Sequence, residues 1–221
     1  MTFDRSERAV NLVEGEVGNG VGADSGSEFV RSSPEFAHFT EDGRLPLPEL
    51  YKRYEQLNKH LWIKELVGYQ IMVNEAGEDT DIVFPIYVYR TVARGKALWL
   101  LAGVHGEEPA GPVALSSSVN ILNRLAKAGI PMVVWPMLNP SGYSRNWRYQ
   151  DLRRGKTGTS TTDCEHLLPK MDDPNSPRFE KAVSRTTEMV TGRMVKLLQE
   201  CYGCMAAFDL HEDEELEGHE D

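Results

Sequence analysis

Three side chains of this sequence have the types and the setting of a zinc site. His105 and Glu108 directly follow an apolar run, and His211 ends a second apolar run. Residues three positions apart in a helix-like turn lie on one side, so His105 and Glu108 can bind the same ion. Two histidines and one glutamate leave a tetrahedral zinc ion one open position for water. We therefore predict one zinc ion per chain, with His105, Glu108 and His211 as its ligands.

A zinc site with an open position predicts hydrolysis. Bound zinc lowers the pKa of its water to about 7 and polarises a carbonyl oxygen as a Lewis acid. The sequence has no His-Glu-x-x-His signature, which disfavours a thermolysin-type site. Asp209 lies close to His211 in the sequence, where it can support a ligand from outside the site.

A polar loop supplies candidate substrate groups. It begins with the turn Asn139-Pro-Ser-Gly142, at the end of another apolar run, and continues through Arg145, Asn146 and Arg148. A guanidinium beside a metal can stabilise a developing oxyanion or bind a carboxylate. We predict that the two arginines, with Trp147 and Tyr149, lie on the site side of the sheet; the alternative is an exposed basic loop.

The cysteines offer a rival metal site. Cys201 and Cys204 have the spacing of a metal-binding pair, and Cys164 and His166 provide two further ligand types. The alternative, which we favour, is that these small thiols pack at a turn between a helix and a strand.

Alternation of strand and helix patterns predicts an α/β fold. We expect a mixed, mostly parallel sheet with helices on both faces, and the first two strands paired as an antiparallel hairpin. Both histidines then lie at carboxyl ends of buried strands, where open α/β sheets bind ligands. The expected helices are 48–60, 109–128 and 177–202, and the expected strands are 61–73, 82–91, 96–104, 131–138 and 204–210.

Composition limits the remaining possibilities. The 221 residues, 40% of them hydrophobic, suit one core. We expect a mobile leader over residues 1–45, an α/β domain over 46–211 and an acidic tail over 212–221. The tail holds seven acids and no Lys or Arg, so only −3 of the net charge of −10 belongs to the rest.

The same features predict the setting of the protein. A nearly balanced body without a basic cluster argues against nucleic-acid binding. The apolar runs are shorter than the ~20 residues of a membrane span. Three cysteines and a charged amino terminus without a following apolar stretch predict a reducing, cytoplasmic location.

These residues together resemble the zinc metallocarboxypeptidase family, which includes aspartoacylase and succinylglutamate desuccinylase relatives. The resemblance covers residues 61–211 and implies that His105, Glu108 and His211 are the zinc ligands. It also implies that Arg148 polarises the substrate carbonyl and stabilises the tetrahedral intermediate, with Arg145 and Asn146 as substrate contacts. The motifs are, in order, Gly103-Val-His105-Gly-Glu-Glu108, Asn139-Pro-Ser-Gly142 with Trp147-Arg148, and Phe208-Asp-Leu-His211.

The sequence departs from the family pattern in two ways. The Asn-Arg pair that binds a terminal carboxylate in these carboxypeptidases is replaced over residues 163–169 by Asp-Cys-Glu-His-Leu-Leu-Pro. Peptides and N-acyl amino acids therefore both stay open as substrates. The family's general base is a glutamate on a later strand, which implies that this chain is an amino-terminal portion with its base beyond residue 221. Glu107, Glu212 and Asp213 are alternatives close to the ligands.

We thus expect zinc-dependent hydrolysis of an amide bond in a peptide or an N-acyl amino acid, by zinc-activated water. The alternative is a catalytically inactive metal-binding or interaction module that lacks the general base. An incomplete sheet exposes an unpaired edge, which favours association into a homo-oligomer.

Overall fold

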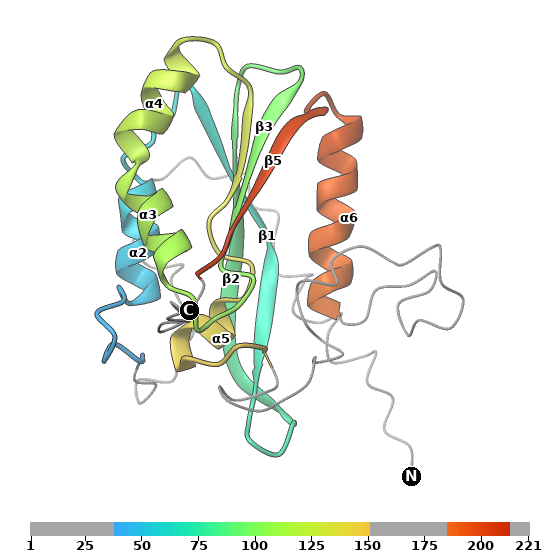
Figure 1. The fold of residues 1–221 in the computed structure, drawn as a ribbon. Coiled ribbons are helices and arrows are strands. Elements are labelled where there is room, and N and C mark those ends of the chain that lie inside the picture. The colour runs from blue at the N-terminus through green and yellow to red at the C-terminus, as the bar shows by residue number, and fades with distance from the viewer. Residues whose placement is uncertain (1–37, 151–184, 213–221) are drawn as a thin grey trace, which may run out of the picture.

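The fold is known from a computed structural model that describes residues 38–150 and 185–212. Figure 1 shows one sheet with α2, α3 and α4 on one face and α6 on the other. The helices are α2 (Leu47–Tyr54), α3 (Ala110–Ser117), α4 (Val119–Lys127), α5 (Pro140–Arg145) and α6 (Arg185–Gln199). The strands are β1 (Trp62–Val73), β2 (Asp79–Thr91), β3 (Ala97–Ala102), β4 (Met132–Trp135) and β5 (Cys204–Leu210). The expected α/β class, with helices on both faces, is confirmed.

The sheet is mixed, in the order β1-β2-β4-β3-β5. The β1–β2 hairpin is antiparallel, as predicted, and β2 also pairs antiparallel with β4. On the other side β3 lies between β4 and β5 and is parallel to both. The carboxyl ends of β3, β4 and β5 therefore meet at one edge, which is where the candidate ligands were expected.

All three expected helices differ in extent, and the last ends at Gln199 rather than at residue 202. The first ends at Tyr54 rather than at residue 60. The segment 109–128, predicted as one helix, forms α3 and α4 with a break at Ser118. The prediction of a continuous helix was wrong because the Ser118 hydroxyl donates to the Ala114 carbonyl and those of Ser116 and Ser117 to that of Val113. Such bonds compete with the helical hydrogen-bond pattern. Residues 177–184, expected at the start of the last helix, lie outside the described residues.

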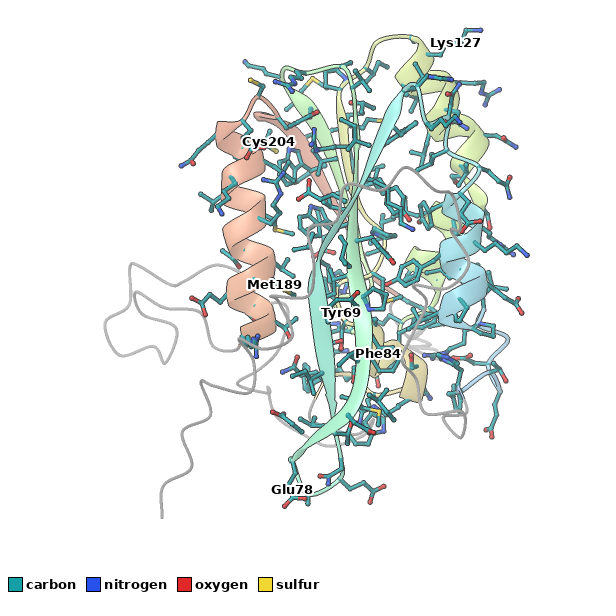
Figure 2. The ribbon with its side chains drawn as sticks, turned by 180° about the vertical axis from the view of Figure 1, so that it is seen from behind. Tyr69, Glu78, Phe84, Lys127, Met189 and Cys204 are labelled. Carbon is teal, nitrogen blue, oxygen red and sulfur yellow. The ribbon has the colours of Figure 1, made fainter. Side chains whose placement is uncertain are left out.

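The core has two parts because successive residues of a strand face opposite sides of the sheet. All four residues of β4 are fully buried. Met132 and Val134 pack with the residues of α2, α3 and α4, whereas Val133 and Trp135 pack with those of α6. Seen from behind, Met189 lies on the side of α6 that faces β1 (Figure 2), where Gly68 leaves room for it.

The edge strand β5 is much less covered than β4. Its side chains are intermediate or exposed, with Phe208 49% and Met205 56% exposed. Within the ranges 38–150 and 185–212, no helix is long and apolar enough to cross a membrane.

The packing of α6 predicts different effects for two neighbouring leucines. Leu197 is fully buried, whereas Leu198 is 43% exposed. Leu197→Ala should lower the free energy of unfolding by about 2–5 kcal/mol, because it leaves a cavity against the sheet. Leu198→Ala should change it by less than about 0.5 kcal/mol. Urea denaturation followed by tryptophan fluorescence measures both, and equal losses would contradict this orientation of α6.

Candidate metal centre

A tight turn after β3 places His105 and Glu108 side by side. Gly103 adopts a positive φ of 67°, which turns the chain out of the strand. The Glu108 amide donates to the His105 carbonyl at 3.4 Å, and His105 Nδ1 lies 2.7 Å from Glu108 Oε1. His105 is 1% exposed and Glu108 8% exposed. Both side chains are thus held at the edge of the core.

The parallel pairing of β3 with β5 brings His211 to the same place. Leu101 pairs with Asp209 and Ala102 with Leu210, so the two strands end together. His211 Nδ1 lies 2.8 Å from Glu108 Oε2, and its Nε2 lies 3.2 Å from Asp209 Oδ2. An Nε2–H that donates to Asp209 is the usual support of a metal-binding histidine, because it leaves Nδ1 either to hold a proton toward Glu108 or to bind a metal in its place. The supporting contact predicted for Asp209 is present.

These three side chains form a group that can hold a metal ion. One ligand atom from each of His105, Glu108 and His211 lies within 4.8 Å of the others. Burial raises the pKa of Glu108, but the hydrogen bonds from both histidines and the charge of His105 outweigh burial and lower this pKa to about 2. Burial lowers the pKa of His211, whereas Glu108 and Asp209 raise it, and the net shift is upward. A cation between these groups replaces protons that the imidazoles otherwise hold.

Arg148 borders this group. Its NH1 donates to Glu108 Oε1 at 3.0 Å and to Glu107 Oε1 at 3.2 Å. Its Nε donates to the Tyr149 hydroxyl at 3.2 Å, and the Tyr149 ring meets the His105 ring edge-on at 5.9 Å. Burial lowers the pKa of Arg148, but Tyr149 and the two glutamates raise it, with a net upward shift. The guanidinium therefore stays charged beside the ligand set.

Asn139 ties the Arg148 loop to the metal-binding turn. Its amide donates to the Gly103 carbonyl at 2.7 Å, and its side-chain oxygen accepts from the Gly142 amide at the start of α5. Its Nδ2 donates to the Arg148 carbonyl, and Gln70, which is fully buried, donates to its Oδ1. The Asn-Pro-Ser-Gly sequence is thus a helix cap that fixes the backbone of Arg148.

Arg145 and Asn146 lie in the same loop with their polar groups engaged by the protein. Arg145 donates to the carbonyls of Val73 and Gln150 and stacks over Trp147 at 3.7 Å. Asn146 adopts a left-handed conformation with a φ of 56° at the end of α5, and its side-chain oxygen accepts a hydrogen bond. Their role as substrate contacts stays a prediction.

The other carboxylates near the ligands also have partners. Glu212 Oε2 accepts from the Ala110 amide at the start of α3, at 3.0 Å. Glu107 contacts Arg148, and Asp209 contacts His211. Asp213, the other alternative base, lies outside the described residues, as do Cys164 and His166 of the rival metal site. Cys201 and Cys204 are exposed free thiols. The expectation that they pack at the turn was wrong, because this turn leads into the poorly covered edge strand β5.

Sequence reasoning missed several supports of the site. Tyr149 was expected on the site side of the loop together with the arginines, but nothing in the sequence linked its ring to His105. The close packing of Gly106 against the loop gave no signal either. These contacts join segments about 40 residues apart, so spacing within a motif could not reveal them.

Comparison of the sequence with protein-family models and with curated proteins found no match. Solved structures do match. Bovine thrombin-activatable fibrinolysis inhibitor, in a complex with tick carboxypeptidase inhibitor, aligns with a TM-score of 0.50 at 14% identity, over 77% of this chain and 61% of that chain. A protein from Shewanella baltica described as a metallopeptidase aligns with a TM-score of 0.49 at 22% identity, over 75% of this chain and 55% of that chain.

The chain has a metallocarboxypeptidase-like fold. The predicted family resemblance is thereby confirmed at the level of the fold. The chain spans 61% of the bovine structure and 55% of the bacterial one. At such low identity the likeness concerns architecture alone, so the chemistry must be argued from the site.

The contact between the metal-binding turn and the loop predicts a severe effect of one methyl group. A Cβ at Gly106 would lie 2.1 Å from the Gly142 carbonyl carbon, 2.3 Å from the Tyr143 amide nitrogen and 2.5 Å from the Trp147 carbonyl oxygen. Gly106→Ala should therefore lower the free energy of unfolding by about 1–3 kcal/mol. The control is Gly192→Ala in α6, where a Cβ meets nothing within 4 Å and alanine should add about 0.5–1 kcal/mol. Unfolding in urea measures both changes, and a neutral Gly106→Ala would refute the close approach.

Proposed function

We propose that this protein is a zinc-dependent hydrolase of amide bonds, acting on a peptide or an N-acyl amino acid. The observation that supports this most is the grouping of His105, Glu108 and His211 within 4.8 Å, with Arg148 3.0 Å from the same glutamate. A metal group and a cation side by side suit a carbonyl that acquires negative charge during hydrolysis.

The ligand set suits zinc. Nitrogen and oxygen ligands lie about 2.0–2.2 Å from zinc, so tetrahedral ligand atoms are about 3.3–3.5 Å apart. The two imidazole–carboxylate distances are 2.7 and 2.8 Å. A shift of under about 1 Å in each contact therefore accommodates the ion. Bound zinc supplies a water of lowered pKa and a Lewis acid for the carbonyl.

The chain's own residues have separable tasks in this proposal. Glu108 is held ionised, which is the form that binds a metal. Asp209 fixes the orientation of His211 through its contact with Nε2. Arg148, already charged at the rim, donates hydrogen bonds to the developing oxyanion. Arg145 and Asn146, which lie in the loop before Arg148, remain the proposed substrate contacts.

A second function, a catalytically inactive metal-binding or interaction module, is favoured by the carboxylates. Amide hydrolysis needs a group that accepts a proton from water and passes it to the leaving nitrogen. Over residues 38–150 and 185–212, Glu107, Asp209 and Glu212 each have a partner in the protein. None of them is thus placed as an obvious proton acceptor.

The metal assignment predicts zinc content. Wild-type protein dialysed against zinc should retain about one zinc ion per chain, because the site supplies three protein ligands. His105→Ala and His211→Ala should each lose it, since two ligands hold zinc weakly. Elemental analysis by mass spectrometry measures the ratio of metal to protein.

Cys201→Ser is the control for the zinc measurement, because Cys201 is an exposed thiol outside the ligand set. This variant should keep its zinc. Retention of zinc in both histidine variants, or its loss in Cys201→Ser, would sink the assignment of the ligands.

The role of Arg148 predicts a defect in turnover. Arg148→Ala should lower kcat by about 10²–10³-fold, the usual loss when one oxyanion donor is removed. Arg148→Lys should recover only part, because an ammonium lacks the planar fork of donors. A panel of peptides and N-acyl amino acids serves as substrate, with zinc content measured in each variant. An unchanged kcat in zinc-loaded Arg148→Ala argues against this role, and an inactive zinc-loaded wild type favours the second function.

A further inference from the structure

Arg44 is a buried arginine far from the metal-binding motifs in the sequence. It lies just before α2, and its side chain is 0% exposed. The segment 1–45 was expected to be a mobile leader, yet residues 38–45 include this side chain and the Phe39 amide, which donates to the Ser144 carbonyl. A charge removed from water is costly unless its partners replace the lost hydration. The groups that hydrogen-bond to Arg44 therefore indicate its structural role.

The guanidinium joins the metal-binding turn to the Arg148 loop. NH1 donates to the carbonyl oxygens of Gly106 and Tyr143, each at 2.7 Å. NH2 donates to the Asn146 side-chain oxygen, also at 2.7 Å. Gly106 lies between the ligands His105 and Glu108 in the sequence, and Tyr143 and Asn146 belong to the turn of chain that precedes Arg148. One side chain thus holds both halves of the proposed site.

Gly106 shows why this contact controls geometry. Its amide donates to the Arg148 carbonyl at 3.1 Å, while its carbonyl accepts from Arg44. Both polar groups of this residue are therefore fixed, one by the Arg148 backbone and one by the Arg44 side chain. Loss of either bond leaves the peptides on that side of Gly106 less constrained, and metal ligands need placement within about 0.5 Å.

The position of Arg44 is itself fixed from the outside. Asp42 accepts from Nε and NH2, with both of its oxygens 2.9 Å from Nε. The guanidinium also lies 4.9 Å from the Tyr143 ring centroid and 5.0 Å from that of Phe39. A planar fork that bonds on several edges and stacks on rings is a property of arginine that lysine does not share.

We propose that Arg44 is a positioning residue of the metal centre: it fixes the His105–Glu108 turn against the Arg148 loop, and it thereby sets the affinity for the metal. This inference rests on the proposed metal-binding function. Arg44 touches neither the ligand side chains nor the reacting atoms, so its effect passes through the backbone of Gly106 and Tyr143.

The test compares zinc affinity and backbone exchange in variants of the whole chain. Arg44→Met keeps much of the apolar stem and removes the donors, and Arg44→Lys keeps the charge and removes the fork. Competition with a chromophoric chelator should show zinc binding weakened by about 10-fold or more in both, the usual loss when a support of a metal ligand is removed. In metal-free protein, amide hydrogen exchange at Gly106 should become faster, because its backbone loses one of its two anchors.

Two controls separate positioning from general stability. Arg53→Met removes another arginine, whose NH1 contacts Ser116 and Ser117 between α2 and α3, and it should keep wild-type zinc affinity. Leu197→Ala destabilises the fold at α6 and should also keep it. Wild-type affinity in both Arg44 variants, or an equal loss in Leu197→Ala, overturns the inference.

The two measurements also distinguish a failure of this inference from a failure of the proposed metal-binding function. A wild-type chain that binds no zinc refutes the proposed function. The exchange measurement is made without metal, so it then decides by itself whether Arg44 fixes the turn. Unchanged exchange at Gly106 in both Arg44 variants overturns the inference whatever the zinc result.

Discussion

The site depends on the parallel pairing of β3 with β5. Because Leu101 pairs with Asp209 and Ala102 with Leu210, the residues that follow each strand emerge beside one another. A slip of one residue would reverse the faces of the β5 side chains and move His211 by more than 3 Å along the strand. The side chains of β5 are poorly covered, so their burial contributes little to this register. The backbone ladder, together with the contacts of Glu108 and Glu212 across the strand ends, therefore bears most of the placement.

Charge balance explains how a buried carboxylate tolerates its position. Glu108 is 8% exposed and lies among two imidazoles and the Arg148 guanidinium. Burial alone would favour its neutral form, but the surrounding donors reverse this preference. The same arrangement makes the centre receptive to a cation, because a divalent ion can replace the protons shared between Glu108 and the histidines. Asp209, on the far side of His211, stabilises the charged imidazole or the metal-bound one alike.

The sequence predicted those parts of the site that depend on local order. Apolar runs ending in His105 and His211 indicate strand ends, and a parallel sheet brings such ends together. Asn139 likewise precedes a proline in a recognisable turn. Arg44 was not foreseen, because its partners lie 62, 99 and 102 residues away and no pattern around it differs from a surface arginine. The break at Ser118 was not predicted for another reason. The serine hydroxyls bond to the helix backbone, and the spacing of apolar residues carries no information about such bonds.

The partners of the four carboxylates bear on which of the two proposed functions the site can perform. Glu108 belongs to the proposed metal-binding group, Asp209 contacts His211, Glu107 accepts from Arg148, and Glu212 accepts from the Ala110 amide at the start of α3. Each of these tasks is electrostatic or positional, and each suits a centre that binds a metal and polarises a carbonyl. Proton transfer requires a carboxylate that reaches both water and the leaving nitrogen. An acid in a fixed ion pair is poorly suited to this because leaving its partner costs energy. These four carboxylates are therefore placed for metal binding and charge stabilisation, and the proposed hydrolysis requires a proton acceptor other than these four.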